Sequence, residues 1–571
     1  MGYYWEKGRE SVFSNSRLKL ILYSLTLAFW LSLDALLVYI FYYRDNALEF
    51  WVIILDVIGI FLIQLKYSKY IPTKVLYLEI IILYTALKLL RFSNVGQNNI
   101  PGLDTYLELL PTRQLISTGH WIPITSNIDL ASTSFYPSLH ILANFIYNIT
   151  NTDLFGSANL LGFYLNMMIF PGYLLIVKYL VKEEKLKLLS LFTYTFTLNL
   201  LWYVRQTLAL VFFIFVLYLL LKMSENRHNI RIVLLLTVII ATLVFSHHLT
   251  RIILTIYLVL GTILSTVFQY YDRRNSQKYI TPKSANMYTL FILLLAILSY
   301  FAYLREFSIE HVLHMVYLTL MGIEKPIEFS YTSPRIPVHA VIYYYGFGFL
   351  IAFSTLKTVI EFIIRKKVDY LSVLFSFFGG ILILVSLILQ YLHVAFTFYR
   401  TFIFIAPFLV LTLSIDLEKK GNRFIHHASL ILLLLFIFVN LSGYPFYMYD
   451  KSIQPDYKLG EHRDYLLIQE KATVTHFDIN DGDVVGNHYI YLSFLYYENK
   501  SIKTDYKFFL HPTTKYKWLY LDKDVDLKRI YIRSTSKMYP YPYVTKALYS
   551  LYNVRFSKVY NNGMVEVYKV T

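Results

Sequence analysis

Long apolar segments alternate with short polar ones along most of the chain. A transmembrane helix needs about 20 mainly apolar residues to cross a hydrocarbon core. The segments that meet this requirement predict about thirteen spans, and hence an all-α polytopic membrane protein. The spans are expected at 18–43, 47–65, 74–91, 157–181, 187–203, 206–222, 231–247, 249–269, 287–304, 337–364, 370–391, 394–416 and 424–444.

Two of the polar stretches between spans are long, at 92–156 and 305–336. Residues 135–150 within the first are apolar enough to suggest a helix. Making them a span would place the basic cluster at 178–187 on the opposite side of the membrane from the other basic loops. We therefore expect 135–150 to form an amphipathic helix on the outer surface.

The pattern changes after the last span, from residue 445 to 571. Charged residues become frequent there, and apolar runs shorten to the length of strands. Asn-Asn-Gly and Asp-Gly turn signals separate these runs. The sequence therefore predicts a transmembrane domain over 1–444 and a small α/β or β-rich soluble domain over 445–571.

Lysine and arginine fix the orientation of the spans, because cytoplasmic loops carry an excess of both. They gather in alternate loops, near 7–17, 66–74, 178–187, 222–231, 273–283, 365–367 and 419–423. This distribution predicts a cytoplasmic N-terminus and a C-terminal domain outside the cytoplasm. The expected location is the plasma membrane, with membrane lipids as neighbours.

Composition narrows the function classes. The chain of 571 residues is 56% hydrophobic and 16% charged, with a net charge of +16, whereas soluble domains are about 25% charged. Cysteine is absent, which excludes disulfides, a thiol nucleophile and a cysteine zinc site. No phosphate-binding glycine loop, dinucleotide fingerprint, HExxH or nucleophile elbow is found. A nucleotide-driven reaction is therefore not supported, and no nucleic acid is expected as a partner.

Candidate catalytic side chains lie near the expected outer face, on different spans. Asp104 could act as a base toward an incoming hydroxyl, and Glu108 follows one helical turn later. Such a pair also suits a divalent cation, although solvated loop carboxylates are the simpler interpretation. Tyr136 and His140 open the surface helix, where Tyr136-Pro137 alone marks only a helix start.

Cations near the same face complete the set. Arg205 and Gln206 are expected in an outer turn, and His247, His248 and Arg251 in a second one. His393 and Arg400 lie in the span at 394–416 or just before it, with Arg400 about two turns deep. Arginines at a membrane edge commonly snorkel to water, but guanidinium groups facing a cavity hold a lipid phosphate. A carboxylate opposed by several cations suits an anionic lipid head group and a reacting hydroxyl.

Two segments, GLDTYLELLPTRQLISTGHW and SFYPSLHILANFIYNITN, resemble the first external loop of integral-membrane type-C glycosyltransferases, which share the GT-C fold. Asp104, Gly119, Trp121 and Tyr136-Pro137 stand where those loops carry an acidic residue, a Gly-x-Trp-like end and a Pro-containing helix start. VRQTLAL, FSHHLT and the ending at 562–568 are similar to archaeal members.

The resemblance implies a polyprenyl-phosphate-linked sugar as donor and a lipid, glycan or protein as acceptor. Asp104 would deprotonate the acceptor hydroxyl, with inversion at the anomeric carbon. Arg205, Arg251 or Arg400 would hold the departing lipid phosphate. A metal ion would then be optional, and no cofactor is expected.

Two departures from the family pattern limit what is carried over. Two additional spans precede the catalytic loop, and the Trp-Trp-Asp-Tyr-Gly-like motif of oligosaccharyltransferases is missing, which argues against transfer of whole glycans to asparagine. Three other functions fit the topology. One is an O-antigen-type polysaccharide polymerase, which relies on arginines. The others are a flippase or transporter of lipid-linked sugars and a structural membrane subunit.

Overall fold

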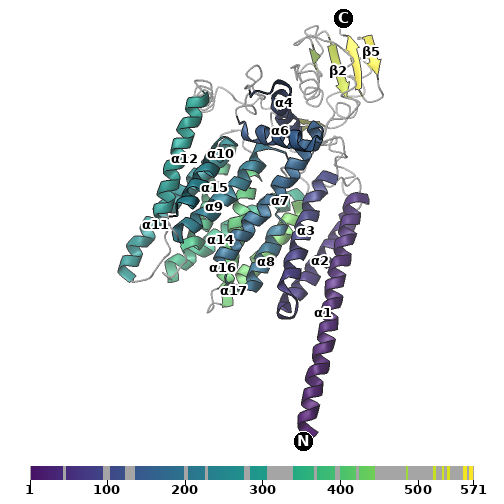
Figure 1. The fold of residues 1–571 in the computed structure, drawn as a ribbon, viewed down its shortest axis with the longest axis vertical. Helices are drawn as coiled ribbons and strands as arrows, with labels where there is room; N and C mark the ends of the chain where they lie inside the picture. The colour runs from purple at the N-terminus through teal and green to yellow at the C-terminus, as the bar shows by residue number, and fades with distance from the viewer. Residues whose placement is uncertain are drawn as a thin grey trace.

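The computed structural model describes most of the first 443 residues and six short strands after them. The described residues are 2–42, 47–93, 103–121, 136–197, 203–225, 229–275, 283–304, 338–365, 370–391, 399–418, 423–443, 484–485, 518–522, 530–532, 537–539, 557–561 and 565–569. They form a bundle of long helices with a small sheet beyond one end, and the N-terminus lies beyond the other end (Figure 1).

The helices follow one another along most of the described part of the chain. They are α1 (Gly2–Tyr42), α2 (Ala47–Lys66), η1 (Ser68–Tyr70), α3 (Thr73–Ser93), α4 (Leu103–Thr118), α6 (Ser138–Thr150), α7 (Leu154–Leu180), α8 (Glu184–Thr195), α9 (Arg205–Glu225), α10 (Ile230–Val244), α11 (His248–Asn275), α12 (Lys283–Leu304), α14 (Val338–Arg365), α15 (Tyr370–Tyr391), α16 (Tyr399–Glu418) and α17 (Arg423–Gly443).

Every expected span contains one of these helices, and six helices among the described residues are long and apolar enough to cross a membrane. One expected span is longer than the helix that the structure shows. The span expected at 187–203 contains α8, which ends at Thr195. Hydrophobicity continues past this residue, so it gives no signal for the end of the helix. The first five residues of the span expected at 394–416 lie outside the described residues, and α16 is described from Tyr399.

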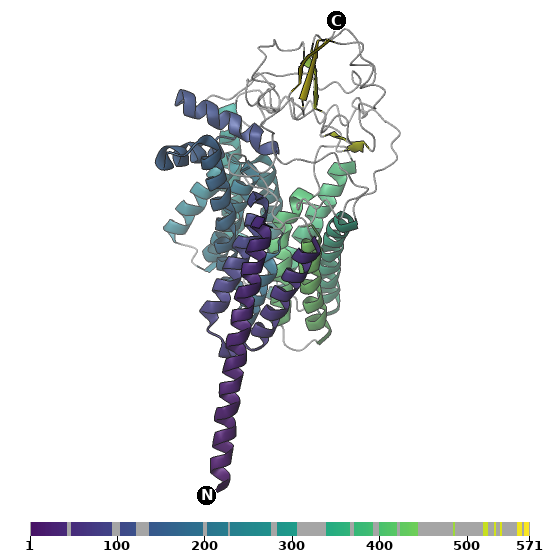
Figure 2. The same cartoon turned by 90° about the vertical axis from the view of Figure 1, so that its right-hand side faces the viewer.

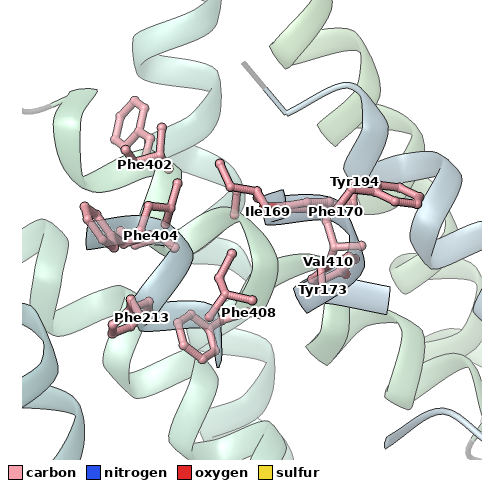
Figure 3. Packing of buried hydrophobic residues seen from close by; sticks show 14 of the residues in the cluster. Ile169, Phe170, Tyr173, Tyr194, Phe213, Phe402, Phe404, Phe408 and Val410 are labelled. Carbon is pink, nitrogen blue, oxygen red and sulfur yellow. The ribbon is translucent and has the colours of Figure 1, made fainter. Parts of the chain in front are cut away.

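Residues from distant parts of the sequence form the core of the bundle (Figure 3). Phe213 of α9 meets Phe404 and Phe408 of α16 edge-on, at 5.4 and 6.1 Å between ring centroids. Tyr173 of α7 stacks on Tyr194 of α8 at 3.8 Å. Aromatic pairs add about 1 kcal/mol each beyond the area that they bury. These contacts join α9 to α16 and α7 to α8.

Side chains of α9 also pack closely on the backbone of α7. A Cβ atom at Gly172 of α7 would lie 2.8 Å from Ile214 Cγ2 of α9. Small residues at helix interfaces let neighbouring backbones approach in this way. The glycine therefore sets the spacing between these two helices.

Buried polar contacts link helices at several other places. Lys357 of α14 forms an ion pair with Asp416 of α16 and donates to Ser429 Oγ at 3.1 Å. Both charged side chains are buried. Removing one charge from such a pair leaves the other buried and unpaired, which is strongly destabilising.

The described strands lie after the last helix. β1 (Val484–Val485), β2 (Trp518–Asp522), β6 (Val565–Lys569) and β5 (Ser557–Asn561) form a mixed sheet in that order, and a separate pair joins β3 (Ile530–Ile532) and β4 (Lys537–Tyr539). β5 and β6 pair antiparallel on either side of the predicted Asn-Asn-Gly turn. Figure 2 shows these strands beyond the end of the bundle opposite the N-terminus. The external loop expected at 305–336 lies outside the described residues.

Candidate functional site

Two short helices lie across the end of the bundle nearest the sheet, α4 and α6 (Figure 1). α6 begins after Tyr136-Pro137, as the sequence predicts, and its C-terminal cap is Asn151 in the left-handed conformation (φ 51°). α4 carries Asp104 in its first turn and Glu108 one turn later. The two helices pack on each other and on α7. This arrangement brings the expected external segment against the ends of the spans.

A buried carboxylate is at the centre of the site. Arg205 Nε, at the start of α9, donates to Glu108 Oε1 at 2.7 Å, and the two side chains are 11% and 6% exposed. His140 Nε2 of α6 lies 3.6 Å from Glu108 Oε2. Glu108 therefore fixes the position of the Arg205 guanidinium.

A hydroxyl of the next turn extends this network. Thr112 Oγ1 shares hydrogen bonds with His140 Nδ1 at 2.8 Å and with Tyr203 OH at 2.7 Å. The indole of Trp121 stacks on the His140 ring, with centroids 5.2 Å apart and planes 15° apart. Three separate parts of the chain are thus held together by buried side chains.

Two tyrosines and two arginines form a continuous stack beside the carboxylate. The Arg205 guanidinium lies over the Tyr136 ring at 5.0 Å, and Tyr136 stacks on Tyr300 of α12 at 5.5 Å. The Arg251 guanidinium of α11 lies over the Tyr300 ring at 4.6 Å. Arginine is well suited to such stacking because its planar cation is weakly hydrated. The stack holds two positive charges on either side of a pair of rings.

The residue that precedes α11 supplies a further buried imidazole. His247 places its Nδ1 3.0 Å from Thr250 Oγ1 in the first turn of α11. Its backbone carbonyl accepts from the backbone N–H of Arg251 at 3.4 Å. His247 therefore lies directly beside the arginine of the stack.

The structure brings together most of the predicted site residues, namely Glu108, Tyr136, His140, Arg205 and Arg251, with His247 beside them.

For three predicted residues the described structure does not extend to the side chain. Asp104 is placed only as a helical residue of α4, and its side chain lies outside the described residues, as does all of His393. Arg400, expected about two turns deep in its span, is the second residue of α16, and its side chain is likewise outside the description. Arg205 was expected in a turn but is the first residue of α9.

Sequence reasoning missed four residues of the site: Thr112, Trp121 as a contact of His140, Tyr203 and Tyr300. Tyrosine and threonine are too frequent at the ends of apolar segments to attract attention individually. Tyr203 stands two residues before Arg205, which was the one local signal. Nothing in the local sequence marks Tyr300 as a site residue, because only tertiary packing brings α12 to the stack.

The described residues contain no group of three or more side chains suited to hold a metal ion. Glu108, which could have joined Asp104 as a ligand, instead pairs with Arg205. The charge that the described site offers to a ligand is therefore carried by arginines.

Comparison with protein families and with curated proteins finds no match. Among solved structures, the chain is similar to the oligosaccharyltransferase of Archaeoglobus fulgidus in its apo form, with 11% identity and a TM-score of 0.49 over 81% of this chain and 70% of that one. The same organism's AglB, in complex with an inhibitory peptide and a dolichol-phosphate, matches with 11% identity and a TM-score of 0.46 over 78% and 69%. ArnT from Cupriavidus metallidurans, bound to undecaprenyl phosphate, matches with 11% identity and a TM-score of 0.37 over 86% and 97%.

Proposed function

We propose that the chain is a membrane glycosyltransferase that moves a sugar from a polyprenyl phosphate to an acceptor hydroxyl at the outer face. The observation that supports it is the stack of Arg205, Tyr136, Tyr300 and Arg251 beside α4 and α6. Two cations held in fixed positions suit a lipid phosphate at the membrane surface. The resemblance of the α4 and α6 segments to the external loop of type-C glycosyltransferases points the same way.

The arginines would stabilise the leaving group. As the anomeric carbon leaves the donor, negative charge develops on the phosphate oxygens, and cations already in place lower the barrier most. Arg205 is held by Glu108 at 2.7 Å and by the Tyr136 ring. Arg251 is held over Tyr300. Neither guanidinium needs to reorganise when the charge appears.

Asp104 is the proposed base. Glu108 is already bound to Arg205, so its protonation would weaken the site that holds the phosphate. Asp104 lies one turn earlier on α4, about 6 Å along the helix axis. In the proposed step the acceptor hydroxyl gives its proton to Asp104 and its oxygen bonds to the anomeric carbon. The bond from that carbon to the phosphate oxygen breaks, and the configuration inverts.

Trp121 offers a donor for the sugar. Its indole N–H is buried beside His140 and has no hydrogen-bond partner in the described part of the chain. A buried N–H without an acceptor is costly. A sugar or acceptor hydroxyl at this position would accept from it.

The test is a transfer assay with the full chain in membranes, supplied with radiolabelled polyprenyl-phosphate sugars. Wild type should form product, and Asp104→Asn should lower the rate by about 10²-fold or more, as expected on removal of a general base. Asp153→Asn is the matched control, because Asp153 caps the N-terminus of α7 in the same external segment. Absence of product from every donor with the wild type would contradict the proposal.

The arginine stack also favours a second candidate, an O-antigen-type polysaccharide polymerase. That chemistry uses arginines without an aspartate base, and both arginines are fixed by contacts that the structure describes. Activity that survives Asp104→Asn but is lost in Arg251→Met would select the polymerase. Movement of a fluorescent lipid-linked sugar across the bilayer, without any transfer, would instead select a transporter.

A further inference from the structure

One outward-facing stripe of α1 has the spacing of a helix-packing interface. Its residues recur at alternating intervals of four and three, and all of them are exposed. We call this stripe the α1 seam: Leu20, Ser24, Leu27, Leu31, Asp34 and Val38. The exposed fractions of Leu20, Leu27 and Leu31 are 68%, 61% and 60%. A repeat of 3.5 residues keeps one stripe of a helix in contact with a second helix over its whole length.

The α1 seam faces away from the rest of the bundle. α1 packs against α2 and α3 through the opposite side, which buries Phe29, Leu33 and Leu36. It lies at the edge of the bundle, and its apolar segment Leu20–Ile40 is long enough to cross a membrane (Figures 1 and 2). Lipid or another transmembrane helix must therefore cover this stripe.

Covering the α1 seam with lipid alone would be unfavourable, because the seam contains the carboxylate of Asp34. It lies inside the apolar segment, about 9 Å from its outer end, and its side chain is exposed. Within the described residues it makes no hydrogen bond and no ion pair. A carboxylate facing hydrocarbon is costly unless a partner neutralises it, and polar groups within membrane helices commonly mark contacts with other helices.

Asp56 of α2 provides a comparison within the same pair of helices. It lies at a similar depth and is also exposed, but it accepts a hydrogen bond from Ser32 of α1. Its charge is thus partly satisfied within the chain. Asp34 lies two residues beyond Ser32 and therefore on the other side of α1.

Among the described residues, a second copy of the chain offers no exposed cation at the depth of Asp34. A two-fold contact between two α1 seams would place Asp34 against Asp34, and like charges repel strongly at low dielectric. The cations exposed on the described spans are Lys66, Lys74, Lys178, Lys185 and Arg231, and each of them lies within one turn of a helix end.

We propose that the α1 seam docks a transmembrane helix of a partner protein, and that this helix presents a lysine or arginine to Asp34. The leucines and Val38 supply the packing surface, and Ser24 lets the two helices approach closely. The ion pair fixes the register and the choice of partner. This interaction is independent of the proposed transfer reaction.

The test uses a defined peptide and the full chain in phosphatidylcholine vesicles. The chain has no cysteine, so Lys69→Cys, in the turn after α2, accepts a single acceptor fluorophore. The probe is a donor-labelled leucine–alanine transmembrane peptide with one central lysine, and the reference is the same peptide with leucine there. Energy transfer measured against the peptide-to-lipid ratio gives the relative affinity of the two peptides.

The lysine peptide should bind wild type about tenfold more tightly than the leucine peptide, the size expected for one interhelical polar contact in a membrane. Asp34→Asn should abolish the preference, whereas Asp56→Asn, the matched control, should keep it. Asp34→Lys should bind a peptide with a central glutamate more tightly than the lysine peptide.

Three results would overturn the proposal. The first is equal binding of the lysine and leucine peptides to wild type. The second is a preference for the lysine peptide that survives Asp34→Asn. The third is a preference for the lysine peptide that is lost only in Asp56→Asn. Energy transfer between two labelled copies of the chain that disappears with Asp34→Asn would show that a second copy covers the seam instead.

Discussion

Glu108→Gln is the substitution that most clearly separates an organised site from a chance contact. Glutamine keeps the shape of the side chain but removes the charge that Arg205 faces at 2.7 Å. With the two side chains 6% and 11% exposed, water screens the pair only weakly. Breaking a buried ion pair by removing one partner costs about 3–5 kcal/mol. Because the amide oxygen still accepts from Arg205 Nε, we expect a loss near the low end, about 3 kcal/mol.

The measurement is unfolding of the purified chain in mixed micelles with increasing SDS, for Glu108→Gln, Arg205→Met and the double variant. The pair should show a coupling free energy of at least about 1.5 kcal/mol, because residues in direct contact are not additive. The exposed pair Lys187–Glu184, one turn apart on α8 with side chains 18% and 48% exposed, is the control. Lys187→Met should change stability by less than about 0.5 kcal/mol.

The reasoning would be refuted if Glu108→Gln unfolded within about 0.5 kcal/mol of wild type. It would also fail if the coupling between Glu108 and Arg205 were no larger than the change in stability that Lys187→Met causes. Either result would mean that the site tolerates an unpaired Arg205, and that Glu108 does not hold the guanidinium in place.

Three further substitutions test other contacts by the same unfolding measurement. Thr112→Val removes the hydroxyl shared by two buried partners and should cost about 1–3 kcal/mol, and a change below the error of the method would contradict the hydrogen bonds. Gly172→Ala should destabilise by about 1–3 kcal/mol through overpacking, while Gly59→Ala, whose added Cβ meets nothing within 4 Å, should not destabilise the chain. Asp416→Asn should cost about 3–5 kcal/mol by leaving a buried lysine unpaired, and wild-type stability would show that this ion pair does not form.

The helices could be predicted from the sequence because crossing a membrane imposes a length and a composition. Thus α2, α9 and α15 begin or end within three residues of the expected spans. The surface helix α6 followed from the orientation of the basic loops, and the structure has it at Ser138–Thr150. The end of α8 at Thr195 could not be predicted. The backbone carbonyl of Thr197, just beyond it, is capped by Lys88 of α3, 109 residues away in sequence.

The site was predictable as a set of polar residues but not as a network. The members that were predicted are ionisable or aromatic residues in the expected external segment or near the end of an expected span, and that pattern is local. Contacts such as Glu108 with Arg205, 97 residues apart, depend on how α4 lies across the bundle. Tyr300 joins the stack for the same reason. Hydrophobic periodicity places helices along the chain, whereas packing decides which helix ends meet.

The measurement that tests the central claim most directly is the single-turnover rate of sugar transfer. It uses the purified chain in liposomes loaded with one radiolabelled polyprenyl-phosphate sugar. The rate is compared between wild type, Asp104→Asn and Arg251→Met. Our account predicts an inverted product from wild type and a rate at least about 10²-fold lower for each variant, the size expected when a base or a charge-stabilising group is removed. A product with retained configuration, or rates unchanged in both variants, would contradict it.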